Sequence, residues 1–72
     1  MKPGDICRVI GGDAAFTYGS IVEVIAADEN NHLARCRLIM GDYRVLGAEA
    51  WHNRYGNIPL NYNKLTRMEE HP

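Results

Sequence analysis

Apolar and polar residues alternate along several short segments of the chain, and this period of two predicts β-strands. The alternation is clearest at 33–40, where one face is apolar and the other carries Arg35 and Arg37. The apolar face of that strand is formed by Ala34, Cys36, Leu38 and Met40. Other runs rich in Val, Ile and Leu predict strands at 5–10, 20–27, 43–50 and 64–68.

Glycine and polar clusters separate these strands. They predict a loop at 11–19, a turn at 28–32, a hairpin turn at 41–42, a loop at 51–57, and a short strand end and turn at 58–63. The segment 43–50 has an alternative interpretation, because Ala and Glu favour helix and its "LGAEA" could begin a helical turn. In the first loop, either Phe16 or Tyr18 is expected to fill the interior of the fold.

Five short strands within 72 residues predict an all-β fold. The economical form is a small, strongly bent five-stranded barrel, with a short turn or 3-10 element before the last strand, because closure hides the sheet edges. A single domain is expected at 1–68, followed by a disordered tail at 69–72. So short a chain leaves little room for an enzyme cleft beside its core, which favours a binding module.

The charges are balanced overall but uneven along the chain. Eight Lys and Arg residues stand against nine Asp and Glu residues, which argues against a protein that coats nucleic acid without specificity. Residues 33–67 nevertheless carry six basic and two acidic side chains, and such polarity suits one specific partner. The alternative is a solvated surface of mixed charge. No apolar run is long enough to span a membrane and no signal peptide is apparent, so a cytoplasmic protein is expected. In that compartment Cys7 and Cys36 are expected to be buried thiols.

The segment "GDICRVIGGDAAFTYGSIVEVI" (4–25) resembles the KOW motif of transcription and ribosomal proteins. In that motif a strand opens with a Gly-Asp pair, and a loop and a glycine lead into a second alternating strand. The matching residues are Gly4, Asp5, Val9, Gly19, Ile21 and Val24. A turn into a tightly bent strand often needs positive φ, which explains a glycine at position 19. The resemblance implies an SH3-like barrel.

The segment "GNIPLNY" (56–62) is similar to a conserved stretch of SH3 domains, whose Pro and Tyr line a groove for proline-rich peptides. The chain lacks the Ala-Leu-Tyr-Asp-Tyr strand of that family, and Trp51 stands too near Pro59. A structural interpretation is therefore preferred, in which Pro59 starts a tight turn. The core of the barrel is then closed by Ile58, Leu60 and Leu65. Peptide binding through Pro59 and Tyr62 is kept as an alternative.

Metal, cofactor and catalytic sites are not predicted. The candidate ligands are His32, His52, His71, Cys7 and Cys36, and no two of them have the close spacing of a metal-binding pair. No pattern couples either cysteine to a histidine and a third group, as nucleophilic catalysis requires.

Two clusters are candidates for binding a partner. Trp51, Arg54 and Tyr55 belong to the residue types that dominate binding hot spots. The alternative for Trp51 is a place in the core. Arg35, Arg37 and Arg44 would share an outward face if 33–40 and 43–50 paired across the turn, forming a basic stripe for phosphate or an acidic protein surface. The alternative is solvated charges beside Glu23.

These features predict a non-enzymatic binding protein that acts on the transcription machinery. The chain is also similar to the small regulators that bacteriophages encode against host bacterial RNA polymerase. That resemblance implies a polymerase subunit as partner, a host-cell cytoplasmic location and a monomer when free, with nucleic acid secondary. The first alternative is an RNA- or ribosome-binding KOW module, in which Arg35, Arg37, Arg44, Arg54 and Lys64 contact phosphate. The second is the SH3-type peptide binder.

Overall fold

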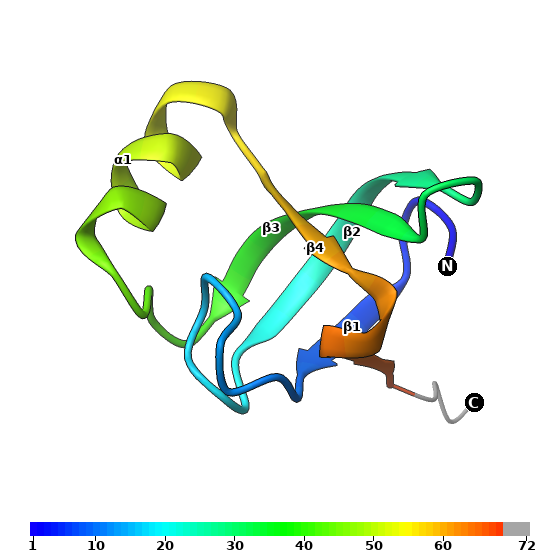
Figure 1. Ribbon diagram of the computed structural model, residues 1–72, viewed down its shortest axis with the longest axis horizontal. Coiled ribbons are helices and arrows are strands. Elements are labelled where there is room, and N and C mark those ends of the chain that lie inside the picture. The colour runs from blue at the N-terminus through cyan, green and yellow to red at the C-terminus, as the bar shows by residue number, and fades with distance from the viewer. Residues whose placement is uncertain (69–72) are drawn as a thin grey trace.

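Five antiparallel strands form one sheet in the computed structural model, which describes residues 1–68 (Figure 1). The elements in chain order are β1 (Ile6–Val9), β2 (Ile21–Asp28), β3 (Leu33–Met40), α1 (Leu46–Tyr55), β4 (Ile58–Asn61), the 3-10 turn η1 (Tyr62–Lys64) and β5 (Leu65–Arg67). The strand order is β4-β3-β2-β1-β5, so β4 and β5 form the two edges. The predicted all-β class is confirmed at the level of an antiparallel sheet, with one short helix added. The predicted tail lies outside the described residues.

One face of the sheet encloses the core. Alternate residues of the strands are buried there, as the period of two predicts: Cys7, Val9, Val22, Val24, Ala34 and Cys36. Irregularities in the β2–β3 register, between Ile21 and Val22 and between Val24 and Ala26, mark bulges, which bend a strand. Phe16 from the first loop is fully buried, whereas Tyr18 is 71% exposed, so Phe16 is the aromatic residue that fills the interior. The predicted core residues Ile58, Leu60 and Leu65 are also buried.

The predicted strand at 43–50 is wrong, and so is the predicted loop at 51–57. Helix α1 occupies most of both segments, and the Gly41–Asp42 step is not a hairpin turn. The chain is extended at Val45, and the helix ends at Gly56, whose φ of 79° is the left-handed conformation that glycine adopts most easily. The physical reason is local propensity, since Ala48, Glu49 and Ala50 all favour helix. The alternative interpretation of this segment is therefore correct.

Pro59 lies inside the edge strand β4 and does not start the turn. The N–H of Tyr62 donates to the carbonyl of His32 at 2.8 Å, and hydrogen-bonded pairs recur at every second residue along an antiparallel ladder. Leu60, opposite Ala34, therefore bonds to β3, and Pro59 faces the open edge. A proline is tolerated there because no ladder hydrogen bond is lost. The turn before the last strand is η1, as predicted.

We expect Gly41→Ala to destabilise the protein by about 2–4 kcal/mol, because it combines strained backbone with overpacking. The φ of Gly41 is 130°, and an added Cβ would collide with the buried side chain of Ser20 and come within 2.9 Å of the Ser20 Cα. Gly12→Ala is the matched control, since a Cβ there meets nothing within 4 Å. Urea denaturation of both variants measures the difference. Equal stabilities would contradict the tight approach of Gly41 to Ser20.

Candidate functional site

Helix α1 is attached to the sheet by a narrow strip of residues. Ala48 is its buried residue, with 7% of its surface exposed, and His52 is half-buried. The larger apolar residues of the helix face outward: Leu46 is 88%, Trp51 48% and Tyr55 51% exposed. In an ordinary surface helix the large apolar residues face the core. This helix shows the reverse orientation, which makes it a candidate for binding a partner.

His52 fastens the helix to β3. Its Nε2 accepts a hydrogen bond from the backbone N–H of Leu38 at 3.3 Å, just beyond the point where β4 stops pairing with β3. Its Nδ1 lies 3.1 Å from the hydroxyl of Tyr43. Because Nε2 must present a lone pair to Leu38, the neutral ring carries its proton on Nδ1, which donates to Tyr43. The ring of Phe16 meets His52 edge-on, with centroids 6.2 Å apart. Sequence reasoning considered His52 only as a metal ligand and missed this role.

Trp51, Arg54 and Tyr55 form one outward stripe of α1, which we call the aromatic stripe. Residues at i, i+3 and i+4 share a helix face, so the helix brings together the three residues that the sequence singled out. The ring centroids of Trp51 and Tyr55 are 4.6 Å apart, and the Arg54 guanidinium carbon lies 5.4 Å from the centroid of Tyr55. Glu49 points to the opposite side, because two residues of helix turn through about 200°. The stripe is therefore aromatic and basic.

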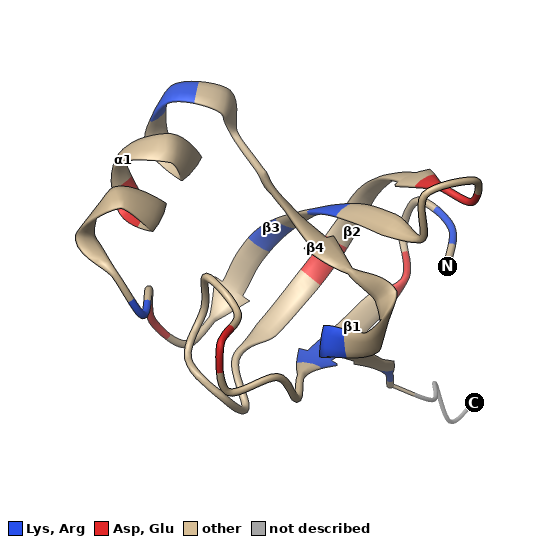
Figure 2. Ribbon diagram, in the orientation of Figure 1, with Lys and Arg blue, Asp and Glu red and all other residues tan. Residues whose placement is uncertain are grey.

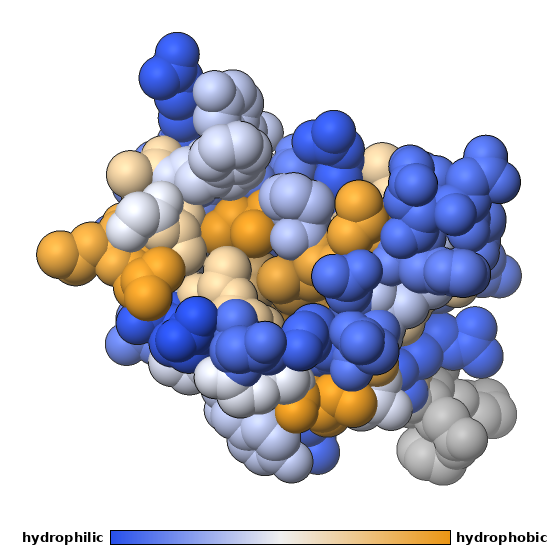
Figure 3. All heavy atoms as spheres, in the orientation of Figure 1, coloured by the Kyte–Doolittle hydropathy of each residue, from blue (hydrophilic) through white to orange (hydrophobic). Residues whose placement is uncertain are grey.

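An open apolar groove runs beside Trp51, between α1 and β4, where Figure 3 shows apolar atoms at the surface. Its volume is about 350 Å³, and its lining includes Ala15, Val45, Ala48, Ile58 and Pro59. A second hollow of about 290 Å³ lies on the other flank of Trp51 and reaches Arg54 and Tyr55. Gly47 lines both hollows, and a side chain there would meet no atom within 4 Å. Trp51 thus stands between two hollows that are open to a partner.

The predicted stripe of three arginines does not form. Arg35 and Arg37 share the outer face of β3 as predicted, but Arg37 pairs with Glu23 of β2 at 2.5 Å. Figure 2 shows basic positions on β3 beside an acidic position on β2. Arg44 is not on a strand beside them. Its guanidinium instead donates to the backbone carbonyls of Ala14 at 2.5 Å and Asp13 at 3.0 Å, tying the first loop to the segment before α1. The interpretation failed because it required 43–50 to pair with 33–40.

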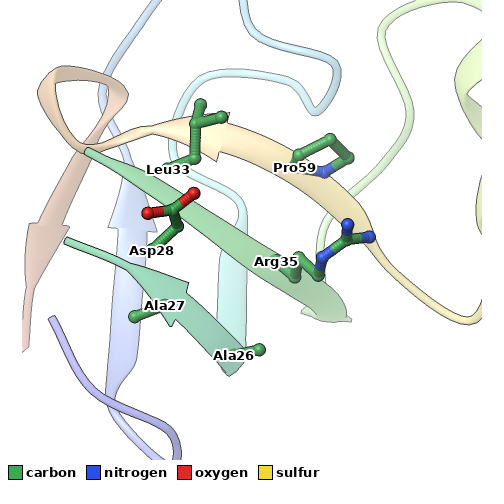
Figure 4. Close-up of a pocket in the computed structure, with 6 residues that line it drawn as sticks. All are labelled: Ala26, Ala27, Asp28, Leu33, Arg35 and Pro59. Atoms are coloured by element: carbon green, nitrogen blue, oxygen red, sulfur yellow. The ribbon is translucent and has the colours of Figure 1, made fainter. Parts of the chain in front are cut away.

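Arg35 borders a small pocket on the outer face of the sheet, with a volume of about 140 Å³ (Figure 4). Arg35 and Pro59 lie side by side at one end, and Asp28 and Leu33 lie at the other. The Asp28 carboxylate accepts hydrogen bonds from the backbone and side chain of Asn31, which lower its pKa. Within residues 1–68 Arg35 makes no ion pair and no side-chain hydrogen bond. The pocket therefore offers an unpaired guanidinium at one end and a carboxylate at the other.

Neither cysteine has the surroundings of a nucleophile. Both thiols are fully buried on the core face of the sheet. Burial raises the pKa of Cys7, and it raises the pKa of Cys36 to about 12, so both stay protonated at neutral pH. In the part of the chain that the structure describes, no three His, Cys, Asp or Glu side chains are grouped to hold a metal ion.

Comparison of the chain with models of protein families, with curated proteins and with solved structures gives no match. Among residues 1–68, no helix has the length and apolar character needed to cross a membrane.

We expect His52→Ala to cost about 1–3 kcal/mol of stability, because the Leu38 N–H and the Tyr43 hydroxyl lose their partner. Asn53→Ala is the control, since Asn53 is an exposed neighbour on the same helix and should change stability by less than about 0.5 kcal/mol. Chemical denaturation measures both. Equal costs would mean that His52 does not fasten α1 to β3.

We also expect both thiols to resist Ellman's reagent in the native protein at neutral pH, because they are buried and fully protonated. In guanidinium chloride both should react fully. The absorbance of the released thiolate follows the reaction. Fast labelling of either native cysteine would contradict its placement in the core.

Proposed function

We propose that this chain is a non-enzymatic protein-binding module that acts on the transcription machinery, most directly by binding a subunit of bacterial RNA polymerase. The contact surface is the aromatic stripe of α1 with the groove beside it. The observation that carries the proposal is the outward orientation of Trp51 and Tyr55 on a helix that buries Ala48. Fully burying a large apolar side chain gains about 1.5–3 kcal/mol. A partner that covers these rings would recover that free energy.

The composition of the aromatic stripe suits a protein interface. Trp, Tyr and Arg are enriched among the residues that dominate binding energy, especially where they meet a pocket at the centre of the contact. Here Trp51 stands between two hollows, and Arg54 is positioned against the ring of Tyr55. The rigid backbone of a helix holds all three side chains in register. Such a surface needs little reorganisation on binding, which lowers the entropic cost.

The intramolecular contacts of the basic side chains favour a protein partner over nucleic acid. Of the five residues expected to contact phosphate in an RNA-binding module, three are engaged within the protein. Arg37 pairs with Glu23 and Lys64 pairs with Asp13 at 2.6 Å. Arg44 bonds to backbone carbonyls. Only Arg35 and Arg54 remain, and two phosphate contacts release few counterions.

The polymerase partner rests on the likeness of 4–25 to the KOW motif and on the likeness of the chain to small phage-encoded regulators of RNA polymerase. Two observations are compatible with it. β1 and β2 pair antiparallel, and Gly19 before β2 has a φ of 87°, the left-handed conformation that glycine adopts most easily. The bent five-stranded sheet with η1 before β5 is likewise compatible with an SH3-like barrel. The same proposal gives a host-cell cytoplasmic location and a monomer when free.

An SH3-type groove for proline-rich peptides has less support. Tyr62 packs against the core, with its ring centroid 5.6 Å from that of His32 and its hydroxyl buried. Pro59, by contrast, is exposed on the sheet edge. The two residues therefore do not offer a shared open aromatic surface.

We expect the protein to bind purified bacterial RNA polymerase, and Arg54→Ala to weaken that binding by about 2 kcal/mol, or roughly thirtyfold. Trp51→Ala should cost at least as much. Asn53→Ala, on the far side of the helix from Trp51, should bind like the parent. Fluorescence anisotropy with labelled protein and polymerases from several bacteria measures the affinities, and circular dichroism confirms that each variant folds.

Two results would count against the proposal in different ways. Full affinity of Trp51→Ala and of Arg54→Ala would remove the aromatic stripe from the interface. Absence of binding to every polymerase tested would reject that partner. Binding that falls steeply with salt and needs RNA would favour the KOW-type RNA-binding module instead.

A further inference from the structure

We infer that the partner presents an acidic segment with an apolar anchor, which lies across Pro59 from the aromatic stripe of α1 to the Arg35 pocket. The inference rests on the proposed function and specifies the chemistry that the surface recognises. It follows from three features: the continuity of two hollows, the sign of the charges at their ends, and the chemistry of the β4 edge.

The two hollows adjoin at one residue. Pro59 lines the apolar groove beside Trp51 and also the small pocket that contains Arg35. Arg35 is the register partner of Pro59, and their side chains lie side by side (Figure 4). The surface therefore continues from Arg54 and Trp51, over the proline ring, to Arg35. Its middle is apolar, and a cation stands at each end.

The surface has one unpaired arginine near each end, and one acid, Asp28, lies at the far end of the Arg35 pocket. Within residues 1–68, neither Arg35 nor Arg54 is in an ion pair. The nearby acids do not neutralise them. Glu49 points to the opposite side of α1 from Trp51. The Asp28 carboxylate stays charged, but it lies at the other end of the pocket from Arg35 and forms no ion pair with it. A segment with carboxylates on both sides of an apolar residue complements this arrangement, and like charges would be repelled.

The β4 edge shows how the segment is held. An exposed sheet edge commonly accepts another strand through backbone hydrogen bonds. Pro59 faces that edge without an N–H, so it interrupts the row of donors. Side chains are then expected to supply most of the recognition: an apolar anchor in the groove, and carboxylates on Arg35 and Arg54.

A second copy of this chain fits the surface poorly. A twofold dimer would place the same patch against itself. Each copy would then offer one acid, Asp28, to the two arginines Arg35 and Arg54 of the other, so at least one arginine would lack a partner. We therefore assign the surface to a different protein.

The test is a selection from a random dodecapeptide library displayed on phage, with the protein held through a C-terminal tag. An extended peptide of that length spans up to about 40 Å, enough to cover the 35 Å long axis of the molecule. Synthetic versions of the selected peptides are then titrated, and the fluorescence of Trp51, the sole tryptophan, reports on the site. Peptides that contain tryptophan are remade with phenylalanine.

We expect the selected peptides to carry Asp or Glu on both sides of an apolar residue and to shift the Trp51 emission to shorter wavelength. Trp51→Ala should abolish binding, measured with a labelled peptide. The double variant Arg35→Glu, Arg54→Glu should weaken it at least tenfold, and lysine in place of the peptide carboxylates should restore it. The control Lys2→Glu, Arg67→Glu makes the same change of charge away from the surface and should bind normally.

Each of the other outcomes contradicts either this inference or the proposed binding face. Peptides that need Trp51 but show no acidic preference would reject this inference and leave the proposed protein-binding face in place. Failure to select any peptide that depends on Trp51 would reject the face itself. Self-association lost in Trp51→Ala would assign the surface to a second copy. A Trp51 emission shift with single-stranded RNA, lost in the Arg35→Glu, Arg54→Glu variant, would assign it to nucleic acid.

Discussion

The burial of Phe16 is the interaction on which the rest of the structure depends. This side chain comes from the first loop and fills the bent face of the sheet. Its ring lies 5.8 Å from Tyr43 and 6.2 Å from His52, measured between centroids, and its backbone forms an isolated bridge with Tyr43. The sheet, the segment before α1 and the helix therefore share one aromatic contact. Through His52, the same contact sets the position of the helix.

Much of the sheet could be predicted, because apolar and polar residues alternate along a strand with one buried and one exposed face. The segment 33–40 shows this, with Cys36 buried and Arg35 exposed. The helix could not be predicted in the same way. Its residues bury little more than Ala48, so no apolar stripe with helical spacing marks an inward face. Only the helix propensity of Ala and Glu favoured a helix at 43–50. The predicted hairpin turn at 41–42 favoured a strand, and the strand was preferred.

The candidate site could be predicted in composition but not in shape. Trp51, Arg54 and Tyr55 lie close together in the chain, so their residue types drew attention before any fold was known. The groove also needs Ala15, Ile58 and Pro59, which reach Trp51 only through the tertiary fold. The basic stripe failed for the opposite reason. The sequence does not distinguish Arg44 from Arg35 and Arg37, but in the fold the Arg44 guanidinium donates hydrogen bonds to the backbone of the first loop.

The pairing of β5 with β1 has a consequence for how the chain acquires its fold. Val9 lies opposite Leu65 and Cys7 opposite Arg67, so the sheet joins the two ends of the described chain. Closing so long a loop costs roughly 3–4 kcal/mol of chain entropy, and topologies rich in such distant contacts fold slowly. During synthesis the sheet cannot be completed until residue 67 has left the ribosome. A chain cut before β5 leaves β1 without its second neighbour.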